Sequence, residues 1–198
     1  MTKLIASLSK EERAADDKTL FGFWLYIMTD CVLFASLFAT YAVLHRNTAG
    51  GAGGIDLFQL PTVLTETLLL LTSSFTAGLA MLAVHKRRKA QTLLWFVITF
   101  GLGVAFLIIE ITEFRHLVHE GNGWSRSAFL SSFFTLVGTH GAHITVGLLW
   151  MAALLTKLWQ RGFTRPVVRR LAMLSYFWHF LDVVWIFIFT IVYLMGVA

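Results

Sequence analysis

Acids and histidines stand inside long apolar runs of this sequence, and their side chains are the ones that could do chemistry. An acid at the centre of a membrane helix costs about 2.5–3.5 kcal/mol on insertion scales, so such groups are expected to face other helices and find partners there. The residues in question are Asp30, Glu66, Glu110, Glu113, His140, His143, His179 and Asp182.

Helical spacing places several of these side chains on common faces. Ser175, His179 and Asp182 follow an i, i+4, i+7 pattern, so they share one face of a helix. His140 and His143 are three residues apart in a stretch rich in glycine and alanine. Small residues let a second helix approach closely, which allows polar side chains to bond across the gap.

Three interpretations of this polar set remain open from the residues alone. The side chains could form interhelical hydrogen bonds, or a polar pocket for lipid headgroups or a subunit contact, or a metal site built from His and Glu. Only three of the seven histidines lie deep in the apolar runs, which disfavours the metal site. We therefore expect no catalytic, cofactor-binding or metal-binding residue, and a lipid-pocket or buried polar network comprising Asp30, Glu66, Glu110, His140, His143, His179 and Asp182.

The runs that carry these residues are long enough to cross a membrane, which takes about 20 apolar residues. Hydrophobic residues make up 57% of the 198 residues and charged residues only 14%. Cys31 is the single cysteine, so no disulfide forms within the chain. The sequence predicts an all-α integral membrane protein, with a polar tail over 1–21 and one five-helix domain over 22–198. The predicted spans are 22–45, 62–84, 93–118, 129–157 and 172–196.

The basic residues predict how the helices are oriented. Of the 16 Lys and Arg residues, all but Arg46, Arg115 and Arg126 fall in the N-terminal tail or in the connections after the second and fourth spans. Basic loops stay in the cytoplasm, so the N-terminus is predicted to be cytoplasmic and the C-terminus periplasmic. The same distribution attributes the net charge of +5 to membrane topology rather than to nucleic-acid binding.

Three segments resemble a known family. Residues 177–187 (FWHFLDVVWIF) are similar to the last helix of subunit III of the haem–copper terminal oxidases, and residues 138–147 (GTHGAHITVG) to the helix before it. Residues 21–30 (FGFWLYIMTD) resemble the helix in which many members carry a membrane-embedded acid, here Asp30. The resemblance covers the chain from about residue 20 to residue 198.

The resemblance implies an accessory subunit of a proton-pumping oxygen reductase in the bacterial inner membrane. Five helices rather than seven are typical of bo-type ubiquinol oxidases and of some bacterial cytochrome c oxidases. The Asp30–Cys31 pair and the glycine-rich segment 50–54 favour the ubiquinol form. A stand-alone membrane metalloenzyme or a transporter is a more distant alternative.

In this family the haems and copper belong to subunit I, so the resemblance implies that this chain binds no redox centre. Its implied partners are subunit I, by direct contact, subunits II and IV of the complex, and membrane phospholipid. The implied role is to stabilise the catalytic subunit and to bind lipid, with Asp30 in a structural or lipid-pocket position.

Overall fold

The computed structural model describes residues 2–51 and 53–197, with side chains from residue 17 onward except those of residues 55, 56 and 197. Five helices are long and apolar enough to cross a membrane, and no strand occurs in the part of the chain described. This confirms the predicted all-α membrane fold. The spans are Asp17–Leu44, Leu60–His85, Lys89–His119, Ala128–Arg161 and Arg165–Leu194.

The chain forms two compact units, residues 1–36 and residues 37–198. Helix α1 (Thr2–Leu44) makes up the first unit and contributes its last turns to the second. The polar segment expected to be a tail is helical from Thr2 onward and continuous with the first span. The division into a tail over 1–21 and a domain over 22–198 stays a prediction.

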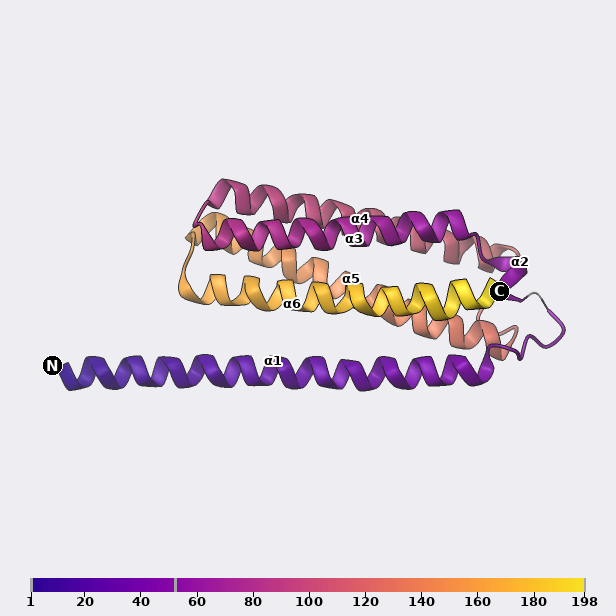
Figure 1. Cartoon of the computed structure of the whole chain (residues 1–198), viewed down its shortest axis with the longest axis horizontal. Coiled ribbons are helices and arrows are strands. Elements are labelled where there is room, and N and C mark those ends of the chain that lie inside the picture. The colour runs from indigo at the N-terminus through magenta and orange to yellow at the C-terminus, as the bar shows by residue number, and fades with distance from the viewer. Residues whose placement is uncertain (1, 52, 198) are drawn as a thin grey trace. The chain divides into compact units, whose positions relative to one another are not determined.

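The second unit is built around four long helices, α3 (Leu60–His85), α4 (Lys89–His119), α5 (Ala128–Arg161) and α6 (Arg165–Ile188). Each of these helices contacts two of the others, in the cyclic order α3, α4, α5, α6 (Figure 1). The arrangement is therefore a closed four-helix bundle, in which side chains on facing helices meet in one core.

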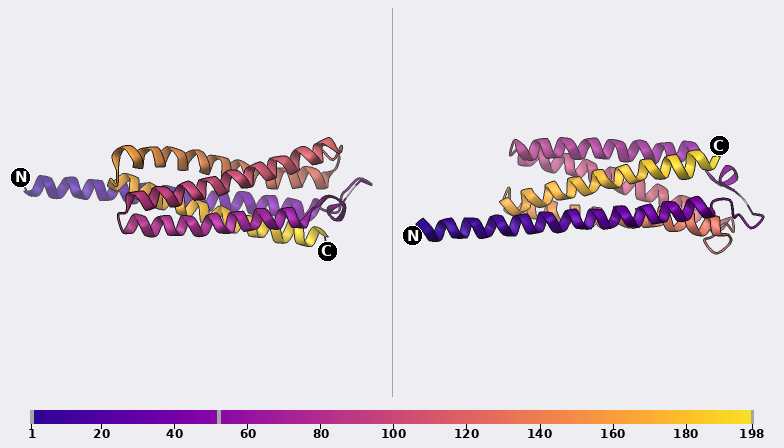
Figure 2. Two further views of the ribbon diagram at one scale, coloured as in Figure 1. Left: turned by 90° about the horizontal axis from the view of Figure 1, so that it is seen from above. Right: turned by 60° about the horizontal axis from the view of Figure 1, so that its bottom comes forward.

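Short helices lie at one end of this bundle. Helix α2 (Gly54–Leu57) contacts α7 (Met195–Val197), which follows the π-helical segment η1 (Phe189–Leu194) after α6 (Figure 2). We call this the α2 end. The opposite end, which carries the connections 86–88 and 162–164, is the basic end.

Local sequence explains where the long helices begin. Pro61 and Pro166 stand in the first turns of α3 and α6, where the missing backbone N–H has no helical partner to lose. Helix α5 begins after Ser127, whose side-chain oxygen accepts a hydrogen bond from the Leu130 N–H at 3.1 Å. Because these signals are local, the helix starts are largely fixed before the bundle assembles.

Small residues let the aromatic core of the bundle close. A Cβ atom at Gly103 of α4 would lie 2.9 Å from Cη2 of Trp178, and one at Gly147 of α5 would lie 3.2 Å from Cζ3 of the same ring. Trp178 is buried between them. The two glycines thus allow α4 and α5 to approach α6 across a large indole.

Candidate functional site

Hydrogen bonds join α3 to α6 through the two buried tryptophans. The Trp178 indole N–H donates to Ser73 Oγ at 3.0 Å, and the Trp185 N–H donates to Thr67 Oγ1 at 3.1 Å. Both acceptors are buried. These bonds satisfy each indole within the apolar bundle and fix how α3 and α6 are rotated against each other.

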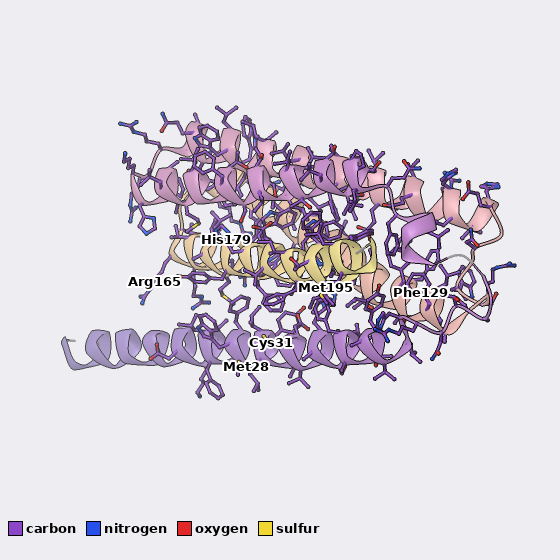
Figure 3. All side chains as sticks on the ribbon, turned by 45° about the vertical axis from the view of Figure 1, so that its right-hand side comes forward. Met28, Cys31, Phe129, Arg165, His179 and Met195 are labelled. Atoms are coloured by element: carbon purple, nitrogen blue, oxygen red, sulfur yellow. The ribbon has the colours of Figure 1, made fainter. Side chains whose placement is uncertain are left out.

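A third link between the same helices runs through Ser74. Its hydroxyl lies 2.5 Å from Nδ1 of His179, which Figure 3 labels on α6, and it also bonds to Asp182. Asp182 Oδ1 has no hydrogen-bond partner among the described residues. Two of the predicted site residues therefore meet at one serine, which the sequence analysis did not single out.

Three glutamates gather on α3 and α4 towards the α2 end, and we call them the acid cluster: Glu66, Glu110 and Glu113. Glu66 interacts electrostatically with both of the others. Glu66 is 0% exposed and Glu110 is 3% exposed. Neither oxygen of Glu66, nor Oε2 of Glu110, has a hydrogen-bond partner in the part of the chain described.

A glycine on α5 makes room for this cluster. A Cβ atom at Gly141 would lie 2.7 Å from Oε1 of Glu110 and 3.2 Å from its carboxyl carbon. No side chain larger than hydrogen fits there while the Glu110 carboxyl stays in place. A Cβ atom at Gly138, one turn earlier, would make only an ordinary contact of 3.7 Å to the Phe114 ring. Gly141 therefore accommodates the carboxyl specifically.

The two histidines of α5 have different surroundings, although they are only three residues apart. His140 is 0% exposed and lies against two aromatic rings, with centroid distances of 5.3 Å to Trp185 and 5.9 Å to Phe106. His143 is half-buried, and its Nδ1 lies 2.7 Å from the Thr139 carbonyl oxygen of its own helix. The predicted pair is thus divided between the core and a local backbone contact.

Asp30 belongs to the first unit, and the other six predicted site residues belong to the second. Tyr26, one turn earlier on α1, donates a hydrogen bond to its carboxylate. The neighbouring Cys31, labelled in Figure 3, has an exposed side chain. Asp30 is therefore supported from within its own helix.

Two pockets lie beside α4 in the second unit. The first, of about 410 Å³, is lined by residues of the α2–α3 connection and of α4, including Gln59, Glu113 and His116. The second, of about 580 Å³, lies between α4 and α5 and is lined by Arg115, His119 and aromatic side chains. None of the seven predicted site residues lines either pocket.

Among the residues that the structure describes, no three His, Cys, Asp or Glu side chains come together in a group that could hold a metal ion. What the geometry provides instead is interhelical hydrogen bonding along α3 and α6 and a separate group of buried acids.

Comparison with known proteins assigns the family. Cytochrome bo(3) ubiquinol oxidase subunit 3 of Pseudomonas aeruginosa is 63% identical over 178 residues, covering 90% of this chain and 85% of the relative. Quinol oxidase subunit 3 of Bacillus subtilis is 48% identical over 182 residues, covering 90% of this chain and 88% of that protein. Cytochrome c oxidase subunit 3 of Bacillus sp. strain PS3 is 49% identical over 177 residues, covering 89% and 86%.

The alignment with each relative thus covers most of this chain and most of the relative. The match to the family is at least as long. Residues 7–197, which include all five membrane spans, match the family described as cytochrome c oxidase subunit III. The protein therefore belongs to the cytochrome c oxidase subunit III family.

Proposed function

We propose that this protein is the accessory subunit III of a proton-pumping haem–copper oxidase that oxidises ubiquinol and reduces O2 to water. The match of residues 7–197 to the subunit III family carries this proposal. The protein is a multi-pass component of a bacterial inner membrane and a non-catalytic part of an enzyme complex. The hydrogen bonds between α3 and α6 support a structural role, because they join two helices of the bundle.

Ubiquinol is the proposed donor because the Pseudomonas aeruginosa relative, at 63% identity, is a ubiquinol oxidase subunit. The Bacillus sp. strain PS3 relative, at 49%, is a cytochrome c oxidase subunit. The donor is tested by purifying the complex in mild detergent through a tag on this chain. Haem absorbance that co-migrates with the chain, with oxygen consumption on ubiquinol and not on reduced cytochrome c, supports the proposal.

Other outcomes of that purification count against it. Oxygen consumption on reduced cytochrome c alone moves the protein to the alternative oxidase class. A haem-free homo-oligomer with its own catalysis or solute flux points to a stand-alone metalloenzyme or transporter. Proposed partners are subunit I, which holds the haems and copper and contacts this chain directly, and subunits II and IV. Mass spectrometry of the same preparation identifies them.

Phospholipid is a further proposed ligand, and the 580 Å³ pocket between α4 and α5 is the place we propose for a headgroup. Arg115 and His119 bring donors suited to a phosphate, while Trp124 supplies an amphipathic ring of the kind found at membrane interfaces. The pocket adjoins apolar helix surface, including exposed Ile111 and Val118, which suits acyl chains.

Replacing Arg115 by alanine is expected to lower the amount of phospholipid that co-purifies, because the phosphate loses its strongest donor. The measurement is the phosphorus content of the complex after loosely bound lipid has been washed away with detergent. Arg126→Ala is the matched control, since Arg126 lies on the same end of the bundle but does not line the pocket. Equal phospholipid in the two variants would show that Arg115 holds no headgroup.

Asp30 is proposed to have a structural or lipid-pocket role. Asp30→Ala is expected to shorten the period over which the oxidase keeps turning over, and to lower its thermal stability or its lipid content. Cys31→Ala serves as the control on the adjacent, exposed position. If the two variants match the unsubstituted complex in turnover lifetime, melting temperature and lipid content, this role of Asp30 is wrong.

The other six residues of the predicted network remain proposals for the same kind of role. Ser74→Ala would remove the hydroxyl shared by His179 and Asp182.

A further inference from the structure

The acid cluster carries an inference that does not depend on the oxidase assignment. Glu66 is fully buried, and both of its carboxyl oxygens lack hydrogen-bond partners among the described residues. Glu110 is 3% exposed and has one such oxygen. A buried polar group without a partner is costly, and most native ones are satisfied by protein or water. These carboxyls therefore require an additional group.

Within the described part of the chain, none of the three glutamates forms an ion pair with Lys or Arg. His116, which interacts electrostatically with Glu113, forms its ion pair with Glu120 at 3.2 Å. Arg115 lines the other pocket. The titratable groups that interact with the cluster are Tyr193 on η1, with Tyr41 of α1 next to it, and His116 on α4 beside Glu113. His140 on α5 precedes Gly141, the residue against which the Glu110 carboxyl lies.

The cluster also has an opening to its surroundings. Glu113 lines the 410 Å³ pocket together with three other polar residues: Gln59 of the α2–α3 connection, Thr62 of α3 and Thr112 of α4. Behind it, the space left by Gly141 holds the Glu110 carboxyl. The cluster thus extends from Glu113 at the pocket to the fully buried Glu66.

We propose that Glu66, Glu110 and Glu113 form a proton-binding site, and that this site exchanges protons with the surrounding water through the pocket lined by Glu113. Protonation accounts both for the carboxyl oxygens that lack hydrogen-bond partners and for the lack of an ion pair with Lys or Arg among the described residues. A proton taken up from the bulk aqueous phase neutralises a carboxylate and turns one of its oxygens into a hydrogen-bond donor for a neighbouring carboxyl. Three carboxyls that interact this closely bind protons as a group.

Infrared spectroscopy of the complete purified complex tests the site, because protonated carboxyls absorb separately from ionised ones. We expect a protonated-carboxyl band that shrinks as the pH is raised and that is lost or reduced in Glu66→Gln and Glu110→Gln. Glutamine keeps the shape of the side chain and leaves it neutral. Asp17→Asn, at an exposed position on α1, is the control and should leave the band unchanged.

A second measurement tests the route. After transfer to D2O, the shift of the same band should be several-fold slower in Thr62→Leu, which fills the pocket without altering an acid. An unchanged exchange rate would exclude this pocket as the path. If neither Glu66→Gln nor Glu110→Gln alters the protonated-carboxyl band, the proton site is wrong. The same holds if the intensity of the band changes with the sodium chloride concentration at constant pH but not with pH. If Glu66→Gln fails to assemble, Glu110→Gln and the unsubstituted complex still decide the outcome.

Discussion

Replacing Trp185 by alanine is expected to lower the free energy of unfolding by about 3–5 kcal/mol, the cost typical of truncating a buried aromatic residue. Trp185 is 0% exposed, and its ring lies 4.7 Å from that of Phe106 and 5.3 Å from that of His140. It also donates the hydrogen bond to Thr67. Truncation would therefore leave a cavity where α3, α4, α5 and α6 meet.

The measurement is an SDS unfolding titration of the full chain in mixed micelles, followed by tryptophan fluorescence or circular dichroism. Trp185→Phe is the matched variant, because it keeps most of the ring and loses mainly the hydrogen bond to Thr67. Interhelical hydrogen bonds in membranes contribute about 0.6 kcal/mol on average and at most about 1.7 kcal/mol, so the phenylalanine variant should lose far less. Equal losses would mean that the hydrogen bond, rather than ring packing, dominates this position.

Gly103→Ala is expected to destabilise the bundle by about 1–3 kcal/mol, although alanine is ordinarily the better helix former. The added methyl group would lie 2.9 Å from Cη2 of Trp178 and 3.0 Å from Cδ2 of Leu148. The indole cannot easily move aside, because it is buried and its N–H is bonded to Ser73. Helices α4 and α6 would have to separate instead.

Gly101 provides the control on the same helix. A Cβ atom there would meet nothing within 4 Å, so Gly101→Ala should be neutral or slightly stabilising. The same SDS titration measures both variants, and the temperature at which the complex releases this subunit gives an independent value. Destabilisation by both substitutions to the same extent would indicate that backbone freedom, rather than contact with Trp178, explains the glycine at position 103.

Much of the fold was predictable because it depends on local features of the chain. The five spans follow from the length of each apolar run, and Pro61 stands in the first turn of the second one, where proline is tolerated. The ends were less predictable. The third span extends from Lys89 to His119, beyond the predicted 93–118, because polar residues at a helix end continue its hydrogen bonding.

The candidate site was predictable only in part. Spacing placed His179 and Asp182 on one face of a helix, but nothing in α6 itself indicates that Ser74 of α3 would bond to both. Spacing also paired His140 with His143, whereas the structure directs one into the aromatic core and the other to its own backbone. Neighbours on one helix can be inferred from periodicity, but partners on another helix cannot.

The sequence by itself determined that this protein spans the membrane five times and carries acids and histidines within those spans. The reason is that hydropathy and helical periodicity are properties of consecutive residues. The tertiary structure decided which of these side chains meet. Glu66 joins Glu110 and Glu113, and the tryptophans of α6 find Ser73 and Thr67, because the rotation and approach of each helix depend on packing between distant residues. The same reason applies to two glycines. Gly103 is required because Trp178 of α6 packs against it, and Gly141 because the Glu110 carboxyl of α4 lies against it.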